Sequence, residues 1–171
     1  GVIYLVPLVP LGLMLENAPR FLMVSFQNMV FGTIELVIFA ITVQKTDTVF
    51  DKNHIKQLFG HTMPIAAALI GLSFVGRLTE TPFNTSEFYL IVGIFLVGSI
   101  LRVLAVYQIG SVAFKFDIVF REDQRLKCDQ LYGLVRHPSY TAMMLVILAY
   151  ALNAHNLLAS ILGLTLAWFG F

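Results

Sequence analysis

The sequence contains very little cysteine and very little charge. Of its 171 residues, Cys128 is the one cysteine and 12% are charged, whereas 58% are hydrophobic. A single cysteine excludes an intramolecular disulfide and a thiolate metal cluster. With a mean hydropathy of +0.82, the chain has too few polar residues to cover a soluble domain of this size. The composition therefore indicates an integral membrane protein.

A secretory signal is also absent from the start of the sequence. Residues 1–15 are apolar but lack a charged leading region, and Pro7 and Pro10 interrupt them. They are compatible either with the end of a spanning helix or with a surface segment. The sequence starts at Gly1 and stops at Phe171 within an apolar run. We therefore expect a processed product or the ordered part of a longer chain, lacking a C-terminal segment.

The apolar residues form runs close to the length that a bilayer requires. Full-length runs cover residues 21–43 and 88–113, and a run of about 15 residues over 62–76 is near the lower limit for a span. Two further runs, 142–152 and 157–171, are separated by Asn153-Ala154-His155-Asn156. Neither crosses the bilayer comfortably at about 1.5 Å per residue, so we expect a helical hairpin that enters and returns. The predicted fold is all-α, a polytopic membrane helical bundle with about 3–4 spanning helices plus a C-terminal helical hairpin.

One membrane domain over residues 1–171 accounts for the chain. Its predicted parts are spanning helices over 1–114, a charged segment over 115–137 and the helical hairpin over 138–171. The loops 44–60 and 115–137 hold eight of the eleven Lys and Arg residues, and Arg77 and Arg20 are expected on the opposite side. Because basic loops favour the cytoplasmic side, these loops are expected there, or on the equivalent face of the endoplasmic reticulum or an organelle inner membrane.

Several polar residues lie inside the apolar runs. Glu35 and Asn28 are seven residues apart and share one helical face, which favours an interhelical hydrogen-bond seam over a proton path. Arg102 is expected either to pair with Glu35 or to contact the head of a cofactor or acceptor. Because His54, His61 and His155 lack the spacing of metal ligands, no metal site is expected.

The residues best suited to chemistry are Leu131-Tyr132-Gly133-Leu134-Val135-Arg136-His137-Pro138-Ser139-Tyr140. Pro138 fits the first turn of a helix, and His137 before it is biased toward an extended conformation. The N–H groups of that helix, together with Arg136, would form a site for a carboxylate or a phosphate. The aromatic faces of Tyr132 and Tyr140 suit a sulfonium or ammonium cation. A positive-inside anchor, with Tyr140 in the interfacial aromatic belt, explains the same residues equally well on physical grounds.

Residues from about 101 to 156 resemble the isoprenylcysteine carboxyl methyltransferase family and its relatives, the membrane phospholipid methyltransferases. The resemblance rests on Leu101-Arg102 with Ala105, Ile109-Gly110, Phe114, Leu126, Tyr132, the block Arg136-His137-Pro138-Ser139-Tyr140, and Asn156. It implies an all-helical membrane enzyme that transfers a methyl group from S-adenosylmethionine to a lipophilic acceptor. In the prenylcysteine branch, this acceptor is the carboxylate of a C-terminal prenylated cysteine, whose lipid tail enters sideways from the bilayer.

The resemblance also implies roles for individual residues. The expected cofactor-binding residues are Leu126, Tyr132, His137, Pro138 and Tyr140. Arg136 and Arg102 are the expected catalytic residues, which would hold a carboxylate. The expected partners are membrane lipid and a prenylated or lipid acceptor, and no nucleic-acid partner is expected.

The chain departs from the family pattern at four places. Gln130 stands where the family has a glycine, Cys128-Asp129 replaces a Thr-Ser pair, and Leu157 replaces the hairpin proline. The chain also stops before a charged helix that bears an Arg and paired Glu residues in the family. These departures favour an alternative, a non-catalytic membrane subunit of a large membrane protein complex that retains the scaffold and contacts other membrane subunits. A small transporter is disfavoured because the full spans are too few for inverted repeats.

Overall fold

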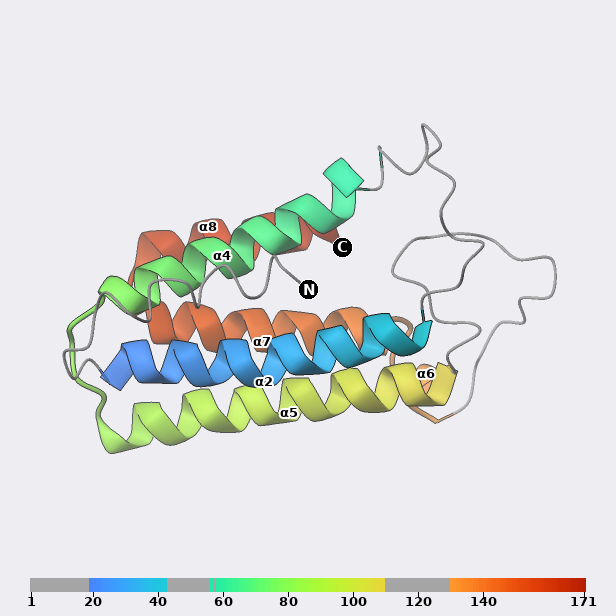
Figure 1. Ribbon diagram of the computed structural model, residues 1–171, viewed down its shortest axis with the longest axis horizontal. Coiled ribbons are helices and arrows are strands. Elements are labelled where there is room, and N and C mark those ends of the chain that lie inside the picture. The colour runs from blue at the N-terminus through green and yellow to red at the C-terminus, as the bar shows by residue number, and fades with distance from the viewer. Residues whose placement is uncertain (1–18, 43–55, 57, 110–129) are drawn as a thin grey trace.

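A computed structural model describes residues 19–42, 56, 58–109 and 130–171 (Figure 1). Every regular element within these ranges is a helix, and no strand occurs in them. Three of the helices are long and apolar enough to cross a membrane. The predicted all-α membrane bundle is therefore confirmed. The segment 1–15 and most of the two charged loops lie outside the described residues.

The helices agree with the predicted apolar runs, with one correction. They are α2 (Pro19–Thr42), the π-helical turn η3 (Leu58–Thr62), α4 (Met63–Leu78), α5 (Thr85–Ile109), the short α6 (Leu131–Leu134), α7 (Pro138–Ala154) and α8 (Leu157–Gly170). The helix is longer than the predicted run over 62–76. The turn η3 continues directly into α4, and together they give an apolar helix of 20 residues, Phe59–Leu78. Pro64 does not end this helix because it lies in the first turn of α4, where a missing N–H is tolerated.

Helix α7 is at the centre of the bundle. It contacts α2, α4, α5 and α8, while α4 and α8 also pack against each other (Figure 1). Large side chains from several helices fill the space between them, among them Phe31, Leu72, Phe95 and Tyr150. The core therefore places α7, which carries the end of the 131–140 stretch, against four other helices.

Glycines allow the closest helix crossings. A Cβ atom at Gly98 of α5 would lie 3.0 Å from the carbonyl oxygen of Ala142 in α7, and one at Gly163 of α8 would lie 2.7 Å from the side chain of Leu72 in α4. Such small residues let membrane helices approach closely, where hydrophobic driving force between helices is weak. The approach of α5 to α7 fixes how the start of α7 meets α5.

The predicted C-terminal hairpin is confirmed. Helix α7 ends at Ala154, and His155 takes a left-handed conformation with φ of 46° as its C-cap. The side chain of Asn156 then accepts a hydrogen bond from the N–H of Ala159 at 3.0 Å, which caps α8. The two helices pack against each other and are 17 and 14 residues long, shorter than a full span.

The bundle has two ends formed by different parts of the chain (Figure 1). At one end lie the start of α2, the end of α4, the start of α5 and the turn between α7 and α8, which we call the hairpin-turn end. At the other lie the ends of α2 and α5, with α6 and the start of α7, which we call the α6 end. The described residues that flank the two charged loops all lie at the α6 end.

Candidate functional site

The 136–140 motif lies at the α6 end, where the chain passes from α6 into α7. Pro138 occupies the first turn of α7, as predicted, and His137 is the N-cap with φ of −134°. The carbonyl oxygen of His137 accepts hydrogen bonds from the N–H groups of Tyr140 and Thr141, both at 3.1 Å. Because Pro138 restricts the backbone and these bonds close the turn, the start of α7 is a well-defined corner.

The two basic residues of this corner face outward. Arg136 and His137 are exposed, whereas Pro138 and Ser139 are buried. Within the described part of the chain, Arg136 forms no ion pair. A guanidinium without a partner is free to bind an anion such as a carboxylate, often through two parallel hydrogen bonds.

Three aromatic rings stack in a column beside this corner. The ring centroids of His137 and Tyr140 are 5.6 Å apart with planes at 24°, and those of Tyr140 and Phe171 are 5.1 Å apart with planes at 29°. Tyr140 therefore meets a ring on two sides and offers its edge and hydroxyl group rather than an open face. The stacking of Phe171 on Tyr140 was not predicted, because nothing in the sequence distinguishes a phenylalanine at the end of an apolar run from the other apolar residues of that run.

A buried ion pair joins three helices behind the corner. Arg102 of α5 donates to Glu35 of α2 through Nε at 2.7 Å and through Nη2 at 3.0 Å. Its Nη1 donates to the hydroxyl of Ser139 in the first turn of α7. The exposed fractions of Arg102 and Glu35 are 4% and 2%. The predicted pairing of Arg102 with Glu35 is thus confirmed, and it reaches the residue between Pro138 and Tyr140.

Asn28 of α2, which shares the helical face of Glu35, forms the predicted interhelical seam. The Asn28 side-chain oxygen accepts hydrogen bonds from the hydroxyl groups of Tyr150 at 2.9 Å and Ser73 at 3.4 Å. These bonds connect α2 with α7 and α4. Polar groups in an apolar bundle are satisfied by neighbouring helices in this way.

Tyr132 docks α6 against α5. Its hydroxyl donates to the carbonyl oxygen of Ala105 at 3.1 Å, and the N–H of Leu131 donates to the Gln108 side chain at 3.1 Å. Burial raises the pKa of the Tyr132 phenol, and the positive charge of Arg102 acts in the opposite direction. Tyr132 therefore lies within electrostatic reach of Arg102. Of the predicted site residues, Leu126 lies outside the described residues.

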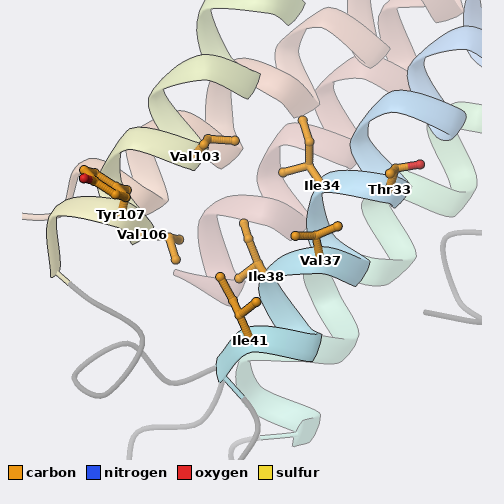
Figure 2. Close-up of a pocket in the computed structure, with 8 residues that line it drawn as sticks. All are labelled: Thr33, Ile34, Val37, Ile38, Ile41, Val103, Val106 and Tyr107. Atoms are coloured by element: carbon orange, nitrogen blue, oxygen red, sulfur yellow. The ribbon is translucent and has the colours of Figure 1, made fainter.

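An apolar groove runs along the neighbouring surface between α2 and α5 (Figure 2). Its volume is about 560 Å³, and its walls include Ile34 and Ile38 of α2 and Val103 and Val106 of α5. Ile34 and Val103 directly adjoin Glu35 and Arg102 in the sequence. The groove is thus suited to an apolar chain.

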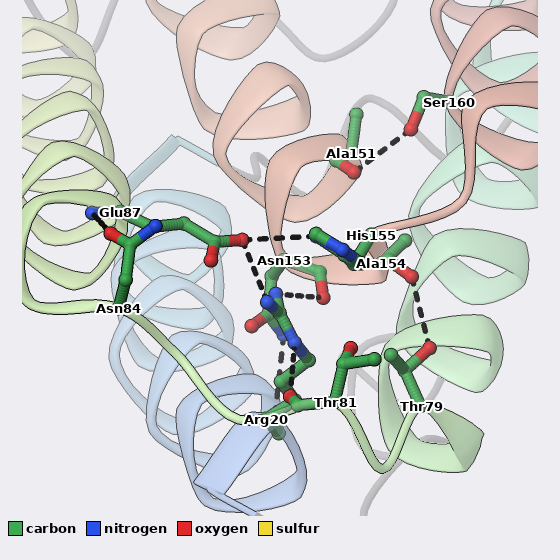
Figure 3. A network of polar contacts seen from close by, with 10 residues as sticks. All are labelled: Arg20, Thr79, Thr81, Asn84, Glu87, Ala151, Asn153, Ala154, His155 and Ser160. Carbon is green, nitrogen blue, oxygen red and sulfur yellow. Dashed lines mark hydrogen bonds and ion pairs between the residues drawn. The ribbon is translucent and has the colours of Figure 1, made fainter.

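A second polar cluster lies at the hairpin-turn end (Figure 3). Arg20 is fully buried and donates to the carbonyl oxygens of Thr81 at 2.7 Å and Asn153 at 3.1 Å, and to the carboxylate of Glu87 at 2.7 Å. His155 also contacts Glu87, at 3.2 Å. Since each guanidinium nitrogen of Arg20 already has a protein partner, this cluster holds helices together and leaves little for a ligand to bind.

One sequence comparison gave a match, and it includes the residues of the corner at the start of α7. Residues 91–171 match the model of the isoprenylcysteine carboxyl methyltransferase (ICMT) family. Neither the comparison with curated proteins nor the comparison with solved structures gave a match. The matched stretch contains every residue that the sequence predicts for the site. This match confirms the resemblance inferred from the 136–140 motif, over residues 91–171 of the chain.

Proposed function

We propose that the protein is an integral membrane methyltransferase that uses S-adenosylmethionine to esterify the carboxylate of a C-terminal prenylcysteine or of a related lipophilic acceptor. One observation carries the proposal. The family match spans the 136–140 motif, in which Ser139 contacts Arg102 of the Arg102–Glu35 pair. The apolar groove lies between α2 and α5, the two helices that this pair joins. A membrane-facing groove next to cationic groups is what a lipid with a carboxylate head requires.

The side chains at the corner fit the charges of S-adenosylmethionine. The exposed guanidinium of Arg136 suits a carboxylate, and the exposed ring of His137 suits a cationic or flat aromatic group. Tyr140, which stacks on His137 and on Phe171, offers its hydroxyl group. The residues proposed to hold the cofactor are Leu126, Tyr132, His137, Pro138 and Tyr140. When bound, the cofactor would supply a methyl group activated by its sulfonium.

The reaction needs no general acid or base from the protein. An ionised carboxylate is already a nucleophile, so a methyl group activated by the bound cofactor could be transferred to it without the chain moving a proton. The chain must align the two partners and exclude water. Arg136 is proposed to hold the carboxylate directly, and its fixed charge orients it without a change in protonation. Arg102, whose three guanidinium nitrogens contact Glu35 and Ser139, is proposed to support the site from behind the first turn of α7.

The groove between α2 and α5 is proposed to take the lipid tail. Its walls are mainly aliphatic, with Thr33 and Tyr107 completing them, and they come from the second halves of α2 and α5 (Figure 2). An isoprenoid chain enters such a groove from the bilayer without crossing water. The family region thus supplies the head site, while α2 contributes one wall of the tail site.

The α6 end is proposed to face the cytoplasm or its organellar equivalent. The described residues that flank both basic loops lie at this end, and basic loops remain on the cytoplasmic side. Partners that follow from this reading are membrane lipid and a prenylated acceptor presented at that face.

The proposal is tested with the full chain in lipid nanodiscs. S-adenosylmethionine with a tritiated methyl group is supplied together with N-acetyl-S-farnesylcysteine, and base-labile methyl ester is counted. We expect methyl transfer by the wild type, and loss of most of it in Arg136→Ala. Titration calorimetry with S-adenosylhomocysteine is run in parallel. Absence of both transfer and binding would overturn the proposal and favour the non-catalytic membrane subunit.

A further inference from the structure

We propose that Glu35 is a positioning residue of the methyl-transfer site, which holds Arg102 so that its third guanidinium nitrogen reaches the first turn of α7. The inference rests on the proposed function. It goes beyond the family match, because Glu35 lies in α2, outside residues 91–171.

The geometry of the pair restricts the orientation of Arg102. Glu35 accepts from Nε at 2.7 Å with one carboxylate oxygen and from Nη2 at 3.0 Å with the other. This two-point contact fixes the plane of the guanidinium as well as its position. The remaining nitrogen, Nη1, then points to the hydroxyl of Ser139.

Ser139 connects the pair to the proposed cofactor residues. It is buried and lies directly between Pro138 and Tyr140 in the first turn of α7. A shift of Arg102 is therefore transmitted to the turn that presents His137 and Tyr140. Misplacement of about 1 Å at such a site lowers the rate about a hundredfold.

The surroundings explain why a charged partner is needed. Glu35 and Arg102 are both buried within helices long enough to span the membrane, where an unpaired charge is strongly unfavourable. Without Glu35, Arg102 would move toward water or toward another acceptor. The carboxylate of Glu35 thus keeps the Arg102 cation at the first turn of α7.

The first test compares Glu35→Gln with Asn28→Ala in nanodiscs, below the melting temperature of both variants. Asn28 is a matched control, since it is a buried polar residue of the same helix that bonds to α4 and α7 away from the site. We expect Glu35→Gln to weaken S-adenosylhomocysteine binding and to lower kcat/KM by roughly ten- to a hundredfold. Asn28→Ala should lower the melting temperature and leave both quantities within about twofold.

The second test exchanges the charges in Glu35→Arg/Arg102→Glu. A purely structural pair would recover both melting temperature and methyl transfer in the double variant. Our inference expects recovery of the melting temperature relative to each single variant, with transfer still low. Full recovery of transfer overturns it. If the double variant does not fold, Glu35→Asp decides, because it keeps the charge but draws it back by one methylene group and should also weaken binding.

The outcomes separate this inference from the proposed function. If the wild type binds S-adenosylhomocysteine but methylates no prenylcysteine, the proposed acceptor is wrong, and the binding affinity of Glu35→Gln still decides the role of Glu35. If Glu35→Gln matches the wild type in affinity, the positioning role is wrong. If the wild type binds no S-adenosylhomocysteine, both ideas are overturned.

Discussion

Two Arg–Glu pairs connect α2 with α5, one at the hairpin-turn end and one toward the α6 end. Their closest nitrogen–oxygen distances are both 2.7 Å, between Arg20 and Glu87 and between Arg102 and Glu35. The other two nitrogens of Arg20 bind the backbone carbonyl oxygens of Thr81, between α4 and α5, and of Asn153, in the last turn of α7. The remaining nitrogen of Arg102 instead binds a side-chain hydroxyl at the start of α7, beside exposed Arg136 and His137.

The difference shows that an ion pair acquires its role from its surroundings. Backbone carbonyl groups are fixed by the fold itself, so the Arg20–Glu87 pair acts as a clamp that holds the helices of the bundle together. Ser139 lies in the first turn of α7, which is part of the candidate site, so the Arg102–Glu35 pair influences the position of that turn. Breaking the first pair should mainly change stability, while changes at the α6 end should mainly change binding and transfer.

The largest effect is expected for Arg20→Ala. This substitution leaves Glu87 without its buried cation and frees two carbonyl groups, and loss of one partner of a buried pair costs about 3–5 kcal/mol. We expect a large drop of the melting temperature in nanodiscs. At a temperature where the variant remains folded, S-adenosylhomocysteine affinity should be close to that of the wild type. Loss of affinity without loss of stability would contradict the comparison.

Arg136→Ala should give the opposite pattern. Arg136 is exposed and has no ion-pair partner among the described residues, so its loss should leave the melting temperature unchanged. A charge-assisted hydrogen bond to a bound carboxylate is worth about 1.5–3 kcal/mol, which predicts roughly a ten- to hundredfold fall in kcat/KM. Arg136→Lys should recover part of this loss, since lysine restores the positive charge but cannot donate two parallel hydrogen bonds as a guanidinium does. A clear decrease in stability would show that Arg136 supports the fold instead.

A smaller effect is expected for Tyr132→Phe. Removal of the hydroxyl breaks the bond to the Ala105 carbonyl and should cost about 1 kcal/mol. Because the pKa of Tyr132 is raised in the folded protein, its contribution to stability is complete below the ordinary tyrosine pKa of about 10 and is lost as the pH rises through the folded value. The difference between wild-type and variant absorbance titrations of phenolate should show one tyrosine ionising late. If all tyrosines ionise at about pH 10, the Tyr132 phenol is exposed to solvent, which would contradict its docking against α5.

The smallest effect is expected for His155→Ala. The His155 side chain is 52% exposed, and its contact with Glu87 is 3.2 Å long, so the pair should contribute less than about 1 kcal/mol. Melting temperature and transfer should both stay near wild-type values at neutral pH. A decrease in melting temperature as large as that of Arg20→Ala would mean that His155, and not Arg20, is the main stabilising partner of Glu87.

Much of the fold could be predicted from the sequence because the signals are local. Run lengths predicted the spans, the polar residues 153–156 predicted the hairpin, and Pro138 predicted where α7 begins. The pairing of Glu35 with Arg102 was also foreseen, since an isolated charge in an apolar run needs a partner. The length of the helix around α4 was not, because the predicted run followed apolar residues alone, whereas the helix continues N-terminally through a π-helical turn that includes His61.

The sequence by itself determined that this protein is a helical membrane bundle with an ICMT-family motif at the start of its hairpin. Only the tertiary structure decided that Arg20 is saturated, that Arg102 reaches Ser139, and that Phe171 stacks on Tyr140. The physical reason is the range of the interactions. Helix length and caps depend on neighbours in the chain, whereas Arg102 and Glu35 are 67 residues apart and meet only through the register in which α2 and α5 pack.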